Sequence, residues 1–504
     1  MRPALAEPAA APRPPLERLA LYLLLGSSAG LPFYMFNAVL LLRLARHDVD
    51  IVLIGFFAWV ALLPVFKFAW APLLDRFAIP GFGRFWGSRR SWIMLSQLGI
   101  FLSMLAMAFT SDDKSLPVTA LFAVLLAFWT TTLEVAADGW RIELAPTQAE
   151  QGPMVTANLW GYRGAMVIAG SGSAYVAGQH GWTWAYLAIA IFAFAPFPIL
   201  CAMRPDPEPS PAGGPRLEPP SRGAALATGL LASAAILFLS LLVTAAIGWL
   251  LLEAAAHAGI TGKTNITPVV LALAILPFVL LALALPWIRR LGPDAPARQS
   301  AAIGPYVDVF WRYDYAVLPL LAFVAIYRMG DVMTLTLSHP MWNARGYSLN
   351  QIAVADGPVA VLSSIAGVGV GGWLATRWRL PFALTVGALG SAIGNWVFVW
   401  LWKVPPSHTA IYLSAGIDQF AHGLEGAVFV VYLSMLVNPR YPVAQFAFLS
   451  GFAFLLPRLV AGASGAMQKQ IGYDGFFWLA GGLSAAAILI LPFMANAKAR
   501  VDDA

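Results

Sequence analysis

The stretch "TTTLEVAADGWRIELAP", from Thr130 to Pro146, carries Glu134, Asp138 and Arg141 within a largely apolar part of the chain. Positions i, i+4 and i+7 fall on one face of an α-helix, so these side chains point the same way. A charge at the bilayer centre costs at least about 2.5 kcal/mol, and such residues usually face a bundle interior or a water-filled space. The stretch therefore predicts a membrane helix with one functional, charged face.

The composition predicts a polytopic membrane protein. Hydrophobic residues make up 59% of the 504 residues, charged residues 11%, and the mean hydropathy is +0.72, values outside the range of soluble domains. The net charge of +6 is explained by basic loops and does not imply a nucleic-acid partner. The single cysteine, Cys201, cannot form an internal disulfide.

The sequence gives no support to enzymatic or ATP-driven activity. It contains no Walker loop, HExxH pair, nucleophile elbow, or Cys and His cluster with metal spacing. We therefore expect a protein that is not an enzyme and has neither a cofactor nor a bound metal.

Apolar runs of about 20 residues predict fourteen membrane helices. They begin near Leu19, Ile51, Trp92, Leu116, Met154, Trp182, Ala224, Pro268, Tyr315, Leu349, Leu380, Thr409, Val443 and Gly475. With a cytoplasmic N-terminus, twenty of the 31 Lys and Arg residues fall in cytoplasmic segments and seven in the opposite loops. This bias predicts that both termini are cytoplasmic.

The remaining four basic residues lie inside predicted helices, two in each half of the chain: Lys67, Arg163, Arg328 and Arg458. Six helices precede a Pro-rich linker, two nearly uncharged helices follow it, and six more complete the chain. The predicted segments are a tail at 1–18, a six-helix bundle at 19–203, the linker at 204–223, the two extra helices at 224–290, a cytoplasmic connector at 291–314, a second six-helix bundle at 315–497 and a tail at 498–504.

The two bundles carry a short internal repeat. "RGAMVIAG" begins at Arg163 in the fifth helix and "RLVAGASG" begins at Arg458 in the thirteenth. Asp418, His422 and Glu425 in the twelfth helix repeat the spacing of the charges in the fourth. Two parallel six-helix repeats are the plan of the major facilitator superfamily, in which substrate binds between the halves near mid-membrane. The fold class we predict is therefore all-α, with two six-helix bundles plus two inserted helices.

The intramembrane charges are the candidate site. Static salt bridges between helices are the alternative, because a buried charge is normally tolerated through pairing. The number of ionisable groups favours a site in which bases attract an anion while acids take up and release a proton. The candidates for substrate binding are Lys67, Arg163, Arg328 and Arg458, with Trp140 and Tyr162 as stacking residues for a sugar ring; those for proton coupling are Glu134, Asp138, Asp331 and Glu425.

A cytoplasmic loop between the second and third helices predicts a gate. "APLLDRF" is followed by "GSRRSW", which places Asp75 and Arg76 beside Arg89 and Arg90. An acid in this position can pair with an arginine or with a helix N-terminus and latch the halves together. The corresponding part of the second half, "GGWLATRWRLP", has no aspartate, so we predict one latch of this kind.

Four blocks resemble a known family over nearly the whole chain. "FKFAWAPLLDRF", "GYRGAMVIAGSGSAY", "IYRMGDVM" and "AQFAFLSGF" are similar to the AmpG-like muropeptide permeases, a branch of the major facilitator superfamily in Gram-negative bacteria. The residues that match the family pattern are Lys67, Asp75, Asp138, Arg163, Gly330 and Asp331, while Arg141 and Arg328 stand where lysine is also met.

The resemblance implies a monomeric, multi-pass inner-membrane protein. It would import anhydromuramyl peptides, which are sugar-peptides recycled from the cell wall and sensed in β-lactamase induction, from periplasm to cytoplasm by proton symport. The chain departs from the family in helix four, where the usual pattern is S-Q-D-I-x-x-D-A-Y/W: Leu133 replaces the glutamine and Glu134 the aspartate. Import of another organic anion, such as a siderophore or an acyl-CoA, therefore stays open, as does a non-transporting assembly role.

Overall fold

The computed structural model describes residues 14–40, 43–44, 59–79, 86–110, 116–203, 278–279, 281–292, 295–300, 302–461 and 463–495. Throughout these ranges the regular structure is helical. The amino-terminal half contains α1 (Leu16–Tyr34), η1 (Met35–Val39), η2 (Trp59–Ala69), α4 (Ala71–Arg76), α6 (Ser88–Ala108), α7 (Leu116–Leu144), α8 (Gln148–Val167), η3 (Ile168–Gly172), α9 (Ser173–His180), α10 (Trp182–Ala193) and α11 (Pro196–Ala202).

A connector of α14 (Pro296–Gln299) and α15 (Gly304–Tyr313) precedes the carboxy-terminal half. That half contains η4 (Asp314–Ala316), α16 (Val317–Tyr327), α17 (Met329–Ala344), α18 (Leu349–Val354), η5 (Ala355–Val359), α19 (Ala360–Arg377), α20 (Leu380–Lys403), α21 (His408–Leu436), α22 (Pro442–Ala461), α23 (Ser464–Ala486), η6 (Ala487–Ile490) and α24 (Leu491–Ala495).

Among the described residues, ten helical segments are long and apolar enough to cross a membrane. Ten of the fourteen predicted helices correspond to these segments. The fifth predicted helix is present as α8, η3 and α9, but its first turns, "QAEQGPM", are polar. The second is described only from Trp59 onward. The linker at 204–223, the seventh helix and the first part of the eighth, up to residue 277, lie outside the described residues.

Glycines mark the ends of two helical spans. Helix five, predicted to begin near Met154, begins at Gln148, where Thr147 caps the helix in a capping box with Glu150, and it ends before Gly181, whose φ is +88°. Helical structure begins again at Ser464 and is interrupted at Gly472, whose φ is +74°, so the last helix begins close to the predicted start at Gly475. Both spans thus end at a glycine in a conformation that other residues rarely adopt.

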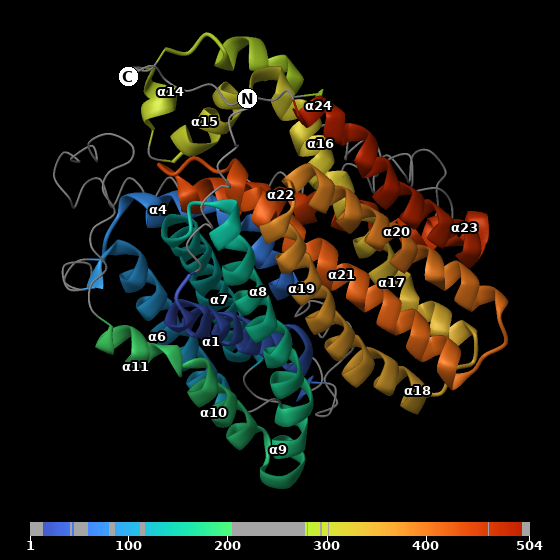
Figure 1. Cartoon of the computed structure of the whole chain (residues 1–504). Coiled ribbons are helices and arrows are strands. Elements are labelled where there is room, and N and C mark those ends of the chain that lie inside the picture. Colours follow the sequence, from blue (N-terminus) through green and yellow to red (C-terminus); the bar gives the residue numbers. More distant parts are fainter. Residues whose placement is uncertain are drawn as a thin grey trace, which may run out of the picture.

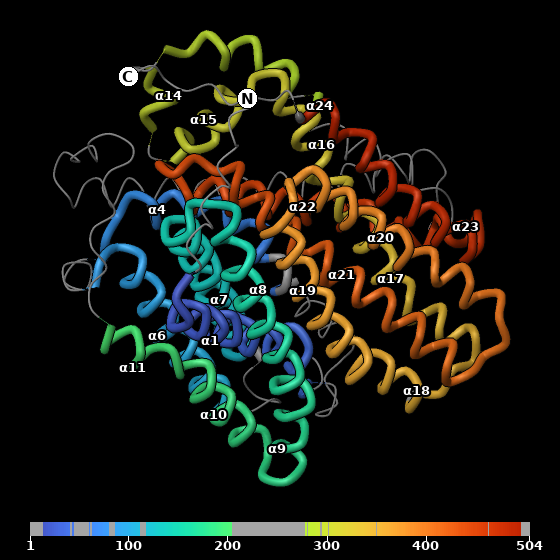
Figure 2. Tube along the Cα trace, in the orientation of Figure 1, coloured from blue at the N-terminus to red at the C-terminus, as the bar shows by residue number. Residues whose placement is uncertain are grey.

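The helices form two bundles that meet along a central seam (Figures 1 and 2). Helices from α1 to α11 lie in one bundle and helices from α16 to α24 in the other. Each bundle has its own apolar core, and both cores include residues of the opposite half: Val443 and Ala447 join the first core, and Ile142 and Val155 the second.

The seam is closed at one end by a close approach of α8 and α19. A Cβ on Gly152 would overlap the Thr376 side chain, and one on Gly372 would overlap the Thr156 hydroxyl. Gln148 Nε2 donates to the carbonyl oxygens of Ala375 and Trp378 at 2.5 and 2.7 Å. We call this end, from Gln148 and Arg377 to Trp160, the closed side.

The same two helices separate toward α9 and α18 (Figure 1). Trp160 Nε1 donates to the Ile365 carbonyl at 2.9 Å, whereas a Cβ on Gly164, Gly170 or Gly172 would meet open space. We call this end the open side. The halves therefore form a V, which is the shape expected of a transporter that presents its site to one face of the membrane at a time.

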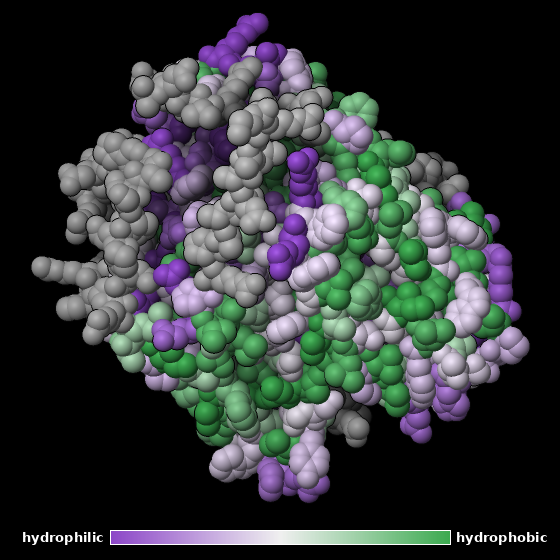
Figure 3. Space-filling model, in the orientation of Figure 1, coloured by the Kyte–Doolittle hydropathy of each residue, from purple (hydrophilic) through white to green (hydrophobic). Residues whose placement is uncertain are grey.

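Apolar side chains cover the middle of the visible surface, and polar residues gather near α14 and α15 at one end and near α9 and α18 at the other (Figure 3). The exposed apolar residues include Leu121, Ile191, Leu335 and Leu362. A belt of this kind, bounded by polar ends, is the surface of a multi-pass membrane protein.

Candidate functional site: a gated, charged interface between two halves

Asp75 joins the two halves at the closed side. Its carboxylate lies 2.8 Å from Arg89 Nη2 and accepts the backbone N–H groups of Val443 and Ala444 at 3.2 and 2.8 Å. These N–H groups belong to the first turn of α22 in the opposite half, where a helix leaves its donors unsatisfied. Both partners expected of a latch, an arginine and a helix N-terminus, are present on one carboxylate.

Arg89 extends this contact within its own half. Its guanidinium also lies 2.7 Å from Glu143 and donates to the Leu74 carbonyl at 2.7 Å. Arg89 therefore fixes the position of Asp75 before the carboxylate meets α22.

Arg141 makes a second link across the seam. Its side chain is 1% exposed, pairs with Asp138 at 2.9 Å and donates to Ser434 Oγ of α21 at 3.0 Å. Its guanidinium lies over the Phe446 ring of α22, 5.5 Å from the centroid. Asp138, a candidate for proton coupling, is thus an ion-pair partner of a seam residue in this conformation.

The connector helix α15 covers the same end. The Tyr306 hydroxyl donates to the Phe68 carbonyl of η2, while Asp308 accepts from Gln445 Nε2 at 2.7 Å and from Asn438 at 3.0 Å. One short helix therefore touches both halves where they meet.

The structure does not support two of the predicted gate residues in a contact between halves. Arg90 is 1% exposed and donates to the carbonyl oxygens of Leu200 and Met203, both at 2.8 Å. These acceptors terminate α11 in the same half, so Arg90 stabilises a helix end there. Arg76 is exposed at the end of α4.

The carboxy-terminal half contains a buried acid and base cluster. Arg328 Nη1 lies 3.3 Å from Asp331 and 3.4 Å from Glu425. His422 Nδ1 lies 2.9 Å from Asp331, which also accepts from Ser391 at 2.7 Å. The close packing of Gly330 against Ser484 and the Ala480 carbonyl places Asp331 in this cluster, because a larger residue would push α17 away from α23.

The amino-terminal half contributes a more open set of charges. Lys67 and Asp138 both act electrostatically on Glu134. Tyr162 is half-buried and lies within electrostatic range of Glu134, Tyr34 and Arg163.

Arg163 and Arg458 differ from the other arginines of the site. Among the described residues, neither has a carboxylate within salt-bridge distance. Arg163 is half-buried with its Nη1 3.6 Å from Met166 Sδ, and Arg458 is exposed with its guanidinium over the Phe454 ring.

The two charged sets act on one another across the interface. Arg163 of α8 is repelled by Arg328 and attracted by Asp331 of the opposite half, and it also repels His422. Tyr162 interacts with Arg458 in the same way across the halves. Charged side chains of the two halves are therefore within electrostatic range of one another.

Trp140 lies away from this region. Its side chain is 4% exposed and packs against Tyr22 of α1, with ring centroids 6.0 Å apart, inside the amino-terminal core. The expected stacking of Trp140 on a sugar ring is contradicted by this placement, because no face of the indole is free.

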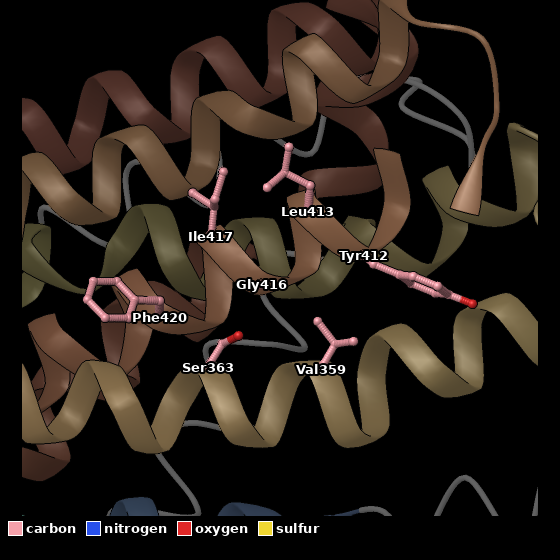
Figure 4. Close-up of a pocket in the computed structure, with 7 residues that line it drawn as sticks. All are labelled: Val359, Ser363, Tyr412, Leu413, Gly416, Ile417 and Phe420. Carbon is pink, nitrogen blue, oxygen red and sulfur yellow. The ribbon is translucent and has the colours of Figure 1, made fainter. Parts of the chain in front are cut away.

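An apolar pocket of about 400 Å³ lies between α19 and α21 (Figure 4). It is lined by Val359, Ser363, Tyr412, Leu413, Gly416, Ile417 and Phe420. On α21, Gly416, Ile417 and Phe420 share a face roughly opposite to that of Asp418, His422 and Glu425. The pocket is therefore separate from the charged site, and Asp418 lies on the charged side, within electrostatic range of Asp331.

Four residues of the site were missed from the sequence: Glu143, Ser391, Gln445 and Phe454. Glu143 lies nine residues after Glu134, on the opposite face of the helix, and Phe454 is one of 31 phenylalanines, so neither carries a local signal. No group of three or more metal-ligating side chains occurs within the described ranges.

Comparison with known proteins agrees with this arrangement. No protein-family model matches the chain. A "Putative transporter AmpG 4" of Rickettsia conorii is 26% identical over 484 residues, which cover 96% of this chain and 98% of that protein. The "Anhydromuropeptide permease" of Escherichia coli is 22% identical over 477 residues, covering 94% of this chain and 79% of the permease.

Solved structures with the same fold include two of XylE. A double-tryptophan mutant of XylE superposes with a TM-score of 0.63 at 14% identity, covering 97% of both chains. XylE described as a proton:xylose symporter and bound to 6-bromo-6-deoxy-D-glucose gives 0.60 at 15% identity over 94% of both chains. The human organic anion transporter MFSD10 gives 0.55 at 15% identity, covering 95% of this chain and all of that one.

The chain has the fold of solved major facilitator superfamily transporters, and ten helical segments among its described residues are long and apolar enough to cross a membrane. Within that class, the resemblance to the AmpG-like permeases is confirmed by homologues that align over nearly the full chain.

Proposed function

We propose that this protein imports anhydromuramyl peptides from the periplasm to the cytoplasm by proton symport. The observation that carries the proposal is the pair of arginines, Arg163 and Arg458, that face the region between the halves without a carboxylate partner among the described residues. A muropeptide supplies carboxylates on its peptide and a neutral sugar portion, which suits a site of cations beside aromatic and polar groups. The names of the AmpG homologues support this substrate class.

Charge balance in the buried cluster supports proton coupling. Among the described residues, Arg328 is the single permanent cation within salt-bridge distance of the two carboxylates, Asp331 and Glu425, and His422 is the additional basic group. An uncompensated charge inside a membrane protein is costly. One proton shared by Asp331, Glu425 and His422 would neutralise the cluster, and its release would leave one negative charge to drive the next step.

The direction of transport follows from the basic loops. The closed side carries Arg76, Arg89, Arg377 and Arg440, which the loop asymmetry assigns to the cytoplasm. The open side then faces the periplasm, in the state that receives substrate. Within this scheme Lys67 and Tyr162 line the substrate path, Glu134 and Asp138 join the proton-coupling set, and the closed seam prevents leakage.

The test is uptake of radiolabelled GlcNAc-anhydromuramyl tripeptide into cells that lack their own permease, with and without a protonophore. We expect uptake that collapses when the proton gradient is removed. Arg163→Ala should reduce uptake to the level of cells without the protein, because the cation that receives the substrate carboxylate is lost.

Lys469→Ala is the matched control, since Lys469 is an exposed cation near Gly472 and outside the interface. Immunoblots of membrane fractions should show equal amounts of both variants. Wild-type uptake by Arg163→Ala would refute the assignment of Arg163. The absence of uptake by well-expressed wild-type protein would refute the substrate, and would turn attention to Leu133 and Glu134.

A further inference from the structure

Phe454 lies between the two charged parts of the site. The Arg458 guanidinium is 5.9 Å from its ring centroid and the Arg328 guanidinium 5.6 Å. Arg458 has no carboxylate partner among the described residues, whereas Arg328 belongs to the cluster with Asp331 and Glu425. One aromatic ring therefore contacts both the unpaired cation and the proton-coupling cluster.

The position of Phe454 on α22 shows which way the ring faces. Gly451, Phe454 and Arg458 are spaced at i, i+3 and i+7 and share a helix face. A Cβ on Gly451 would lie 2.8 Å from the Val65 carbonyl of η2, so this face is pressed against the opposite half one turn below Phe454. Phe454 itself is 37% exposed.

The exposed part of the ring consequently faces the region between the halves and not the lipid. A lipid-facing ring would carry both guanidinium groups toward the hydrocarbon, where unpaired arginine is strongly disfavoured. Phe454 thus lies about one helical turn from the contact between Gly451 and Val65.

We propose that Phe454 is a positioning residue that holds Arg458 by a cation–π interaction, so that this guanidinium receives a substrate carboxylate at the base of the site. The same ring also contacts Arg328. Phe454 therefore links the substrate cation to the proton-coupling cluster through a single side chain. This inference rests on the proposed function, because it assigns the docking point of the substrate's acidic group.

Physical chemistry gives the size of the effect. A cation–π interaction at a partly desolvated site is worth roughly 1 kcal/mol, which corresponds to about fivefold in a dissociation constant. Phe454→Leu keeps an apolar side chain of similar size and removes the ring. Phe454→Tyr keeps the ring, and should restore the interaction.

The experiment uses the purified full chain in nanodiscs and two ligands, GlcNAc-anhydromuramyl tripeptide and the same compound with its peptide carboxylates converted to amides. Titration calorimetry measures binding, and proteoliposome uptake gives KM and kcat. For the acidic ligand we expect Phe454→Leu to raise Kd and KM about fivefold with kcat within twofold of wild type. Phe454→Tyr should bind as wild type, and the amide should bind equally to all three proteins.

The outcomes separate this inference from the proposed function. If wild-type protein binds the acidic ligand and Phe454→Leu binds it with the same Kd, the role of Phe454 is overturned and the proposed function is not. An equal loss for the acid and the amide, or failure of Phe454→Tyr to restore binding, shows a packing role and also overturns it. No binding of the acidic ligand by wild-type protein overturns the proposed function and this inference together.

Discussion

Replacing Asp75 by asparagine should open the closed side. The wild-type carboxylate is 5% exposed, pairs with Arg89 and accepts two N–H groups from α22. The amide of asparagine retains one oxygen and no charge, so Arg89 loses an ion-pair partner and at least one α22 donor loses its acceptor. Hydrogen bonds to charged groups contribute about 1.5–3 kcal/mol each, and a broken buried pair costs about 3–5 kcal/mol.

Part of this cost is regained, because Glu143 still pairs with Arg89. We therefore expect the closed arrangement to lose roughly 2–4 kcal/mol relative to one in which the halves separate there. This changes the equilibrium by roughly 30- to 1,000-fold. An open population of about one part in a hundred in wild type would rise to roughly a quarter or more.

The assay is electron–electron double resonance between spin labels at Arg76→Cys and Arg440→Cys, in a Cys201→Ser background. Both arginines are exposed beside the seam, one in each half. Wild type should give one short distance, and Asp75→Asn a second, longer one. Glu150→Gln is the matched control, since it alters a charge on the same side yet preserves the capping box of α8. An Asp75→Asn distribution equal to that of wild type would refute the latch.

Two further substitutions test the seam and the core. Gly372→Val should prevent closure, because the valine side chain would collide with Thr156 of α8. We expect uptake to fall at least tenfold while the amount of protein in the membrane stays normal. Gly164→Ala is the control and should transport normally, because its methyl group would point into open space. Trp140→Phe should lower the free energy of unfolding by about 1 kcal/mol or more, seen as a lower melting temperature, and leave the KM for uptake unchanged, because Trp140 packs on Tyr22 inside the bundle. A raised KM at an unchanged melting temperature would contradict that placement.

The sequence was sufficient to predict the two-bundle fold because membrane helices are specified by local composition. Hydropathy and loop charge identify each span without knowledge of its neighbours. The bend at Gly472, which separates the last span from the helical segment before it, was not predicted, because it depends on a positive φ that composition does not encode.

Individual roles were harder to predict than the set of charges. The burial cost of a charge marks Arg90 and Arg328 equally, but the partner decides the role: carbonyl groups of α11 for Arg90 and carboxylates of α17 and α21 for Arg328. The α11 carbonyl groups and Glu425 lie far away in sequence, whereas Asp331 is three residues from Arg328. Asp75 could be predicted more fully, since an acid beside a basic loop has few alternatives, although the structure was needed to identify α22 as its hydrogen-bond donor.

The contacts that close the seam and the proposed substrate cations, Arg163 and Arg458, lie on the same two helices, α8 and α22. On α8, Gln148 contacts α19 at the closed side and Arg163 lies 15 residues further along; on α22, Val443 contacts Asp75 and Arg458 also lies 15 residues further along. At 1.5 Å per residue, each cation is about 22 Å from its gate contact. A rigid movement of either helix therefore displaces its gate contact and its cation together.

Electrostatic repulsion then links substrate binding to closure of the open side. Arg163 is repelled by Arg328 and attracted by Asp331 across the halves, so these two interactions oppose one another. Arg163 and Arg458, one in each half, have no carboxylate partner among the described residues, and their mutual repulsion in a low-dielectric region opposes approach of the two halves. An anionic substrate placed between the cations reverses the sign of that interaction, so the halves attract one another through the ligand. If the helices move as rigid bodies, closure of the open side must break the Asp75 contacts at the closed side. Under the proposed function, the charge of the substrate then triggers opening of the closed side.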